Sequence, residues 1–514
     1  MGAIDSKDSK NPLEHILGLF ADVRGGEGAT VLLLALNVFL VLLAYYIMKT
    51  VREPLILVGG GAEVKSYSSA GQAMLLLGAV PLYGALAGRL SRKRLINFVT
   101  LFFIACIVVF CILYRLRVPF LGVAFYLWVG IFSGMVIAQF WSFANDIYTP
   151  EAGKRVFAII AFGASLGAVL GGQAANRLTD RFGKDALPVV LLLLVAAGLL
   201  VLSLVITNLI DSRERRKAVT RAPVQAKEAE EPIGKGGAFR MILSSRYLLL
   251  IALLMMFLNW VNTTGEYILS RTVGSAAKEA VRSDAAGEFT ADELNKATAV
   301  IDEEELSQDE YNEAYAAATA AIDAGQSSEE EYKNRVDDHI RKERIANYIY
   351  KQRSGRFIGK FYGDFFSVVN LVSLIMQLFL VSRILKYLGV RIALLILPVI
   401  AFGGYALIIL VPVLSTIRVA KTAENSTDYS LQNTVRQVLF LPLTREQKYK
   451  AKQATDTFFV RAGDLLQAVL VFVGVRLSFE TKHFALVNLI LVVVWIALAI
   501  MIGRENRKLT ADSE

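Results

Sequence analysis

A segment of membrane-spanning length that nevertheless carries charges constrains this chain most: residues 415–440, STIRVAKTAENSTDYSLQNTVRQVLF. Apolar runs cover residues 390–414 before it and 458–475 after it. On a helix, its polar residues recur every three or four positions and form one seam: Arg418, Lys421, Asn425, Asp428, Gln432 and Arg436. Ionisable groups at bilayer depth face a protein interior or a wet cavity. The segment therefore predicts a helix that lines a pathway, with a long surface loop as the alternative.

The composition is typical of a polytopic membrane protein. The 514 residues are 55% hydrophobic, and the mean hydropathy is +0.48. Lys and Arg exceed Asp and Glu by 55 to 46, which in a membrane protein reflects cytoplasmic loops and does not imply a nucleic-acid partner. The two cysteines share one apolar run, and three scattered histidines disfavour a catalytic or metal centre. We expect no cofactor, no metal site and no enzyme activity.

Runs of about 20 apolar residues predict the other membrane spans. In the first half of the chain they cover residues 29–50, 69–90, 95–114, 120–143, 156–175 and 187–210. In the second half they cover residues 247–269, 357–380, 390–414, 458–475 and 484–502. With the polar segment added, the sequence predicts an all-α membrane protein of twelve transmembrane helices in two six-helix halves.

Residues 275–351 interrupt this scheme, because they are acidic and alanine-rich and contain no run able to span. Their helical spacing predicts two or three soluble helices after the seventh span, outside the cytoplasm. A solvated insertion is favoured over a lid or a docking module for an unknown partner. The predicted parts of the chain are a cytoplasmic amphipathic segment (1–28), an N-terminal bundle (29–210), a cytoplasmic linker (211–237), helix seven (238–274), the insertion (275–351), the rest of the C-terminal bundle (352–503) and a cytoplasmic tail (504–514).

Basic loops set the orientation and suggest a family of folds. Lys and Arg clusters fall on the side shared by both termini, which predicts cytoplasmic ends. Residues 84–94, GALAGRLSRKR, resemble the loop signature of major facilitator transporters, and residues 383–391, RILKYLGVR, form a degenerate partner. The ends of spans one and seven also align, with Glu53 on Glu266 and Thr50 on Thr263. These echoes favour a parallel duplication with a substrate site between the halves.

Charges that close the first span suggest what the site would bind. Lys49 and Arg52 either snorkel to the membrane interface or face a central cavity, where they would hold phosphate oxygens. Glu266 and Asp364, on spans seven and eight, would offset that positive charge and bind a coupling cation or proton. Tyr45, Tyr46, Trp141 and Trp260 are candidates for stacking on a base.

Four segments resemble the ATP/ADP translocase family of plastids and intracellular bacteria: YYIMKTVREPLIL, FWSFANDIYTPEAGKRVFAIIAFGASLGAVLGG, IGKFYGDFF and RQVLFLPLTREQKYKAKQATD. The last is the most specific and carries the family's proline-leucine phrase and its basic run at Arg436, Pro442, Leu443, Lys448, Lys450, Lys452 and Asp456. The sequence departs from the family in span four, where residues 127–130 hold no acid, and in span seven, where Glu266 lies one turn beyond Asn262.

The resemblance implies a major-facilitator-like carrier that exchanges ATP for ADP by alternating access. Together with the charge pattern it gives these candidate substrate-binding residues: Lys49, Arg52, Glu53, Asn145, Asp146, Asn262, Glu266, Asp364, Arg418, Lys421, Asp428 and Arg436. The candidates for gating or charge balance are Arg155, Lys450, Lys452, Asp456, Arg461 and Asp464.

Expectations about partners and location follow from the same resemblance. We expect a small-molecule anion, ATP or ADP with phosphate as the alternative, as the substrate of a monomer in the lipid bilayer of a bacterial inner membrane. One alternative is a facilitator of another organic or phosphorylated anion, with or without coupling to protons. Another is a transport-inactive scaffold or receptor that acts through the insertion at residues 275–351.

Overall fold

A computed structural model describes residues 27–89, 92–148, 150–183, 187–220, 238–284, 289–303, 308–321, 329–440, 443, 451 and 455–511. The predicted amphipathic helix within residues 1–28 and residues 221–237 of the linker lie outside the described part of the chain. Every regular element in the described ranges is helical, so the all-α prediction is confirmed.

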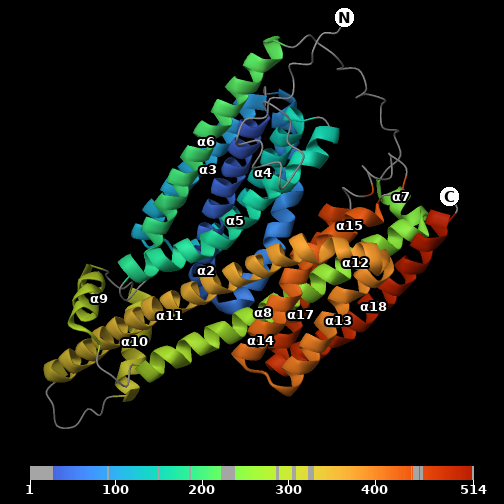
Figure 1. The fold of residues 1–514 in the computed structure, drawn as a ribbon. Coiled ribbons are helices and arrows are strands. Elements are labelled where there is room, and N and C mark those ends of the chain that lie inside the picture. Colours follow the sequence, from blue (N-terminus) through green and yellow to red (C-terminus); the bar gives the residue numbers. More distant parts are fainter. Residues whose placement is uncertain are drawn as a thin grey trace, which may run out of the picture.

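The helices fall into two groups in chain order (Figure 1). The N-terminal half comprises α2 (Gly28–Arg89), α3 (Arg92–Arg115), α4 (Leu121–Ile147), α5 (Pro150–Phe182) and α6 (Val189–Thr220). The C-terminal half comprises α7 (Ala238–Ser244), α8 (Arg246–Asp284), α11 (Glu329–Phe379), α12 (Val381–Tyr387), α13 (Gly389–Leu410), α14 (Leu414–Thr427), η1 (Asp428–Gln432), α15 (Asn433–Leu439), η2 (Thr455–Phe459), α17 (Val460–Arg476) and α18 (Thr481–Ala511). Two short helices, α9 (Ala291–Glu303) and α10 (Gln308–Ala321), lie between α8 and α11.

Nine helices in the described ranges are long and apolar enough to cross a membrane. One of them, α2, holds the first two predicted spans, because it kinks at Gly61, whose φ of 72° is a conformation that glycine adopts readily. The polar tenth span is a continuous helical path through α14, η1 and α15, and α17 covers the eleventh. The helical interpretation of residues 415–440 is therefore confirmed, and the surface-loop alternative is wrong.

The two halves meet at one end and diverge at the other. Contacts between them join α2 and α5 of the first half to α8, α11 and α17 of the second. In Figure 1 the blue-to-teal helices and the orange-to-red helices separate toward the end where both termini lie. The described contacts between the halves therefore lie toward the face opposite the termini.

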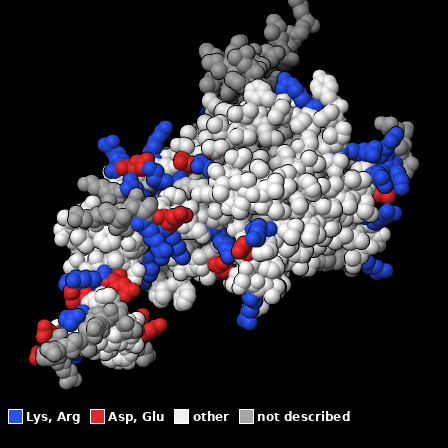
Figure 2. Space-filling view, turned by 90° about the horizontal axis from the view of Figure 1, so that it is seen from below, with Lys and Arg blue, Asp and Glu red and all other residues white. Residues whose placement is uncertain are grey.

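The outer surface suits a bilayer. Large apolar side chains are exposed along several helices, among them Phe98, Leu101 and Phe102 on α3 and Val469 and Phe472 on α17. Figure 2, which views the face opposite the termini, shows a broad surface without charges and a projecting lobe on which acidic and basic side chains gather. Apolar side chains pack in the interior and also face lipid, so their exposure does not distinguish the inside of the protein from its surface. Burial is informative here only for the polar residues.

The insertion is continuous with the helices on either side of it. Helix α8 runs on to Asp284, and α11 begins at Glu329, so the predicted boundaries at residues 275 and 351 fall inside helices. Arg353 donates two hydrogen bonds of 2.6 and 2.7 Å to Glu293 and so fastens α9 to α11. Tyr311 of α10 donates a 2.7 Å hydrogen bond to Asp337 of α11. The described part of the insertion is more constrained than its alanine-rich composition indicates.

Candidate functional site

Three charged residues form a buried triad on α2, around its kink. The Arg52 Nε donates a 3.1 Å hydrogen bond to Glu53 Oε1, and Lys65 Nζ lies 2.6 Å from Glu53 Oε2. Glu53 is fully buried, and Lys65 is 8% exposed. The Arg52 guanidinium also lies over the ring of Tyr126, 4.4 Å from its centroid. The kink at Gly61 lets Lys65, twelve positions after Glu53, come back into contact with Glu53.

The C-terminal half supplies a second network, centred on Lys421 of α14. Lys421 is 1% exposed, and its ammonium lies 3.0 Å from Glu424 Oε1 and 3.8 Å from Glu266 Oε1. It also donates a 2.8 Å hydrogen bond to the side-chain oxygen of Asn262. Asn425 donates a 2.9 Å hydrogen bond to Glu266. A charge buried this deeply needs such partners, because a lone ion in an apolar medium is very costly.

A cavity of about 150 Å³ lies between these two networks, where the halves meet. Its polar lining includes Lys49, Arg52, Lys65, Asn262, Glu266 and Tyr429. Two hydrogen bonds of 2.7 Å cross from half to half beside it, from Lys65 to Ser270 and from Ser66 to Gln467. The sequence alignment of Glu53 on Glu266 thus corresponds to two carboxylates that line one cavity from opposite halves.

Lys49 differs from the other cations of this cavity. Its ammonium lies 4.1 Å from the ring centroid of Phe366 and 5.2 Å from that of Tyr46. Among the described residues, no carboxylate lies within ion-pair distance of Lys49, whereas Arg52 and Lys65 share Glu53 and Lys421 has two. Aromatic faces stabilise a cation only modestly. Lys49 is therefore placed to pair with an anion that enters the cavity.

The middle of the polar tenth span is a π-helical turn. The turn covers η1, and it buries Asp428 and Gln432. Asp428 lies 3.8 Å from Arg436 across it. A π turn inserts an extra residue into the helix and rotates the side chains that follow it, a geometry common at functional sites. The seam predicted for a regular helix is therefore divided: Lys421 and Asn425 reach the central network, while Asp428 and Arg436 form a separate pair.

Other predicted site residues lie away from the cavity. Asp364 accepts a 2.7 Å hydrogen bond from Asn176 where α5 meets α11. Arg418 lies over Phe361, 5.3 Å from the ring centroid. Arg461 lies 3.0 Å from Asp464 within the C-terminal half, where Asn259 also donates to Asp464, and Asp456 is exposed.

Several predicted residues fall outside what the structure describes. Lys450 and Lys452 lie outside the described residues, and the side chains of Asn145, Asp146 and Arg155 are not described. Of the aromatic candidates, Tyr46 donates to Asn370 at 3.1 Å, and Tyr45 stacks on Phe132 at 6.4 Å. Trp141 packs on Phe157 and Trp260 on Phe257, each with its ring against its own half.

Sequence reasoning missed Lys65, Glu424 and Tyr126. Lys65 lies four residues after Gly61, the last glycine of the turn, so it falls before a second span that hydropathy begins at residue 69. The position of Lys65 in the sequence could have identified it. A helix that begins again after Gly61 carries Lys65 in its first turns, which lie near the end of span one. Glu424 lies three residues from Lys421, the spacing at which a helix pairs opposite charges.

Two protein families match parts of the chain. Residues 28–270 match the Major Facilitator Superfamily, and residues 401–506 match the TLC ATP/ADP transporter family. No curated protein matches the chain.

Solved structures match nearly the whole chain at low identity. A bacterial homologue of the iron transporter ferroportin in an inward-facing state has a TM-score of 0.55 and 11% identity and covers 92% of this chain and 98% of its own. The nucleoside transporter NupG has a TM-score of 0.51 and 12% identity, with 91% and 98% covered. A bacterial homologue of the human lysosomal transporter Spinster, inward-facing and unoccupied, has a TM-score of 0.50 and 12% identity, with 94% and 98% covered.

At these identities the structural likeness shows the fold alone, a multi-pass major-facilitator fold. The family matches add what the fold does not, because they cover both halves and distinguish a transporter from an enzyme. The chain is therefore a membrane transporter of the major-facilitator fold, and its residues 401–506 are similar to the TLC ATP/ADP transporter family.

Proposed function

We propose that this protein exchanges adenine nucleotides, ATP against ADP, by alternating access through the cavity between its halves. The observation that carries the proposal is the charge of that cavity. Lys49, Arg52, Lys65 and Lys421 gather at the boundary of the halves, and Lys49 has no carboxylate partner among the described residues. A phosphate group that pairs with Lys49 completes the charge balance of the site.

Anion binding would act on the contacts between the halves. Lys65 holds Glu53 in its own half and Ser270 in the other, so a phosphate that draws Lys65 weakens a contact across the boundary. An empty site leaves the charge of Lys49 without a carboxylate among the described residues, and an unpaired cation is costly to enclose during reorientation. A carrier of this kind reorients when loaded and not when empty, which produces exchange.

The small volume of the cavity suggests that it holds only the charged phosphate end of the substrate. Its 150 Å³ is below the range of roughly 300–1,000 Å³ found for drug-sized ligands. The phosphates would occupy this cavity, and the base would lie toward the side on which the halves diverge, along Tyr45 and Tyr46 of the same helix as Lys49.

A different phosphorylated or organic anion is the second candidate substrate. It is favoured by span four, where the residues around Trp128 hold no acid and pack instead on Phe125 and Phe132. A site with fewer acids discriminates less against other anions.

Exchange in proteoliposomes tests the proposal. Vesicles loaded with ADP should take up labelled ATP faster than vesicles loaded with buffer, and unlabelled ATP outside should compete. Vesicles loaded with phosphate or with a dicarboxylate measure the second candidate in the same assay. Uptake that depends on one of these anions and not on ADP overturns the nucleotide assignment, and the absence of uptake with any anion favours a scaffold or receptor.

A further inference from the structure

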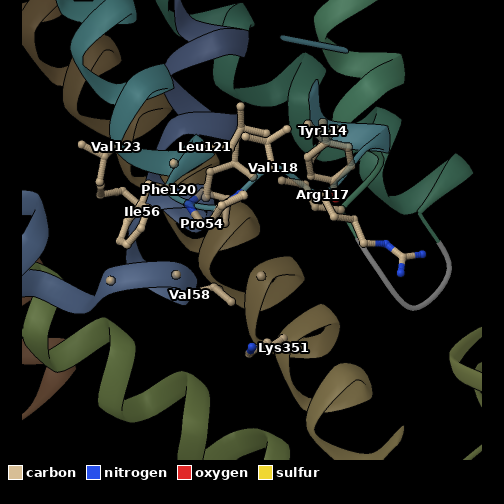
Figure 3. A pocket seen from close by; sticks show the side chains of 18 of the residues that line it. Pro54, Ile56, Val58, Tyr114, Arg117, Val118, Phe120, Leu121, Val123 and Lys351 are labelled. Carbon is tan, nitrogen blue, oxygen red and sulfur yellow. The ribbon is translucent and has the colours of Figure 1, made fainter. Parts of the chain in front are cut away.

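A second, larger cavity lies between the N-terminal half and α11, at the face opposite the termini. Its volume is about 650 Å³. Figure 3 shows Ile56 and Val58 of α2 and Val118 of the α3–α4 connection on one side of it, with the part of α11 that carries Lys351 on the other. The cavity does not share its lining with the central site, so transport chemistry does not account for it.

The lining of this cavity combines apolar side chains with one sign of charge. Its charged residues are Arg115, Arg117 and Lys351, and none of its described lining residues is a carboxylate. Arg117 donates a 3.4 Å hydrogen bond to the carbonyl oxygen of Val300, while Arg115 and Lys351 are exposed. An apolar space with cations at its edge is complementary to an amphipathic anion and not to a small polar solute.

We propose that this cavity binds one anionic phospholipid of the surrounding bilayer. An acyl chain occupies the apolar space beside Ile56, Val58 and Val118, and the phosphate lies at Arg115 and Lys351. The volume is within the range of roughly 300–1,000 Å³ typical of ligand pockets. Cations beside a membrane surface attract anionic lipid by about 1 kcal/mol each.

The position of the cavity points to the membrane as the source of its ligand. The helix that supplies Arg115 exposes Val108, Val109 and Ile112 along its length, as a lipid-facing helix does. Phe120, on the connection that lines the cavity, is 84% exposed. A lipid therefore reaches the cavity along an apolar surface without crossing water.

Because both halves line the cavity, its occupant also affects conformation. α2 and the α3–α4 connection belong to the first half, and Tyr348, Lys351 and Gly355 belong to α11 of the second. A ligand that contacts both halves stabilises the arrangement in which this face is closed. Anionic lipid should thus favour the form that opens toward the termini.

Lipid-dependent thermal stability of the purified full chain tests this site. Delipidated protein in an uncharged detergent is titrated with phosphatidylglycerol, with phosphatidylcholine, and with glycerol 3-phosphate as a soluble headgroup. The variants are Arg115→Gln with Lys351→Gln, and Gly355→Leu, which fills the cavity because a Cβ there lies 3.9 Å from Val58 Cγ2. Lys333→Gln, an exposed lysine elsewhere on α11, and Gly355→Ala are the matched controls.

Phosphatidylglycerol should raise the melting temperature more than phosphatidylcholine does, and glycerol 3-phosphate should not raise it. Its apparent affinity should fall about fivefold for each cation removed, and Gly355→Leu should abolish the difference between the lipids. Both controls should behave as wild type. Equal stabilisation by the two lipids, stabilisation by glycerol 3-phosphate through Arg115 and Lys351, or variants that respond as wild type would each overturn the proposal.

Discussion

Substitution of Lys49 should change the proposed anion binding without changing the stability of the fold. Lys49 is half-buried on the rings of Phe366 and Tyr46 and has no carboxylate partner within the described ranges. Removing its charge therefore leaves no buried acid unpaired. Glu53 is the opposite case, because two buried cations depend on its single carboxylate. The two residues line the same cavity, yet substitution should affect different properties.

Lys49→Gln should weaken anion binding and leave the fold intact. A hydrogen bond to a charged group contributes about 1.5–3 kcal/mol, so the apparent affinity for the exchanged anion should fall about tenfold or more. The measurement is concentration-dependent uptake in proteoliposomes, with Lys482→Gln, an exposed lysine outside the cavity, as the control. A Lys49→Gln protein that transports with wild-type affinity would contradict a phosphate contact at this residue.

Glu53→Gln should destabilise the fold itself. It leaves Arg52 and Lys65 buried without their carboxylate, and breaking a buried ion pair typically costs about 3–5 kcal/mol. Thermal unfolding in detergent measures the loss. The double variant Glu53→Gln with Lys65→Met should regain part of it, because one unpaired charge is removed. If the double variant is no more stable than Glu53→Gln alone, the cost does not come from the unpaired cations.

At the scale of elements, hydropathy was enough to locate the spans and not enough to describe their geometry. The polar tenth span was recognisable because Lys421 and Asn425 recur at helical spacing. The π turn at Asp428 was not, since no local composition marks the insertion of one residue into a helical ladder. Lys65 was missed for a related reason: its role depends on where the chain returns after Gly61. Contacts between segments that are distant in the sequence determine these features, and they cannot be predicted from a single sequence.

The insertion offers an element-scale prediction through Glu293. Hydrogen bonds from Arg353 are the largest cause that lowers the pKa of Glu293 to about 2, from an ordinary value of 4.5. A carboxylate with a lowered pKa contributes stability that is complete above its unfolded pKa and is lost as pH falls toward its folded pKa. The docking of α9 on α11 should therefore persist from neutral pH down to about 5 and weaken between about 4.5 and 2.

The mobility of a spin label on α9 measures this docking. The label is placed by Asn295→Cys, an exposed position, with Cys106 and Cys111 replaced by Ser and Ala. Mobility should increase on acidification, and the added substitution Glu293→Gln should give high mobility at neutral pH already. A label that stays immobile in Glu293→Gln at neutral pH would show that this ion pair does not hold α9.

At the scale of the whole molecule, the closed face depends on helices that pack without side chains between them. A Cβ at Gly172 of α5 would clash with the carbonyl oxygen of Gly363 and lie 2.5 Å from Ser367 Oγ, both on α11. The hydrogen bond from Asn176 to Asp364 crosses the same boundary one turn away. This contact joins one half to the other, so it must separate if that face opens in the alternating-access cycle that we propose.

Gly172→Val should therefore shift the conformational equilibrium without damage to either half. The added side chain meets backbone that cannot move aside alone, so α5 and α11 must part and the closed face opens more often. Hydrogen exchange should accelerate at the ends of α5 and α11 on that face, and the exchange rate in proteoliposomes should fall. Gly198→Val on α6, where a Cβ meets nothing within 4 Å, is the control for a bulky residue in a transmembrane helix. If both variants exchange hydrogen and substrate alike, the close approach of α5 and α11 is not what holds this face shut.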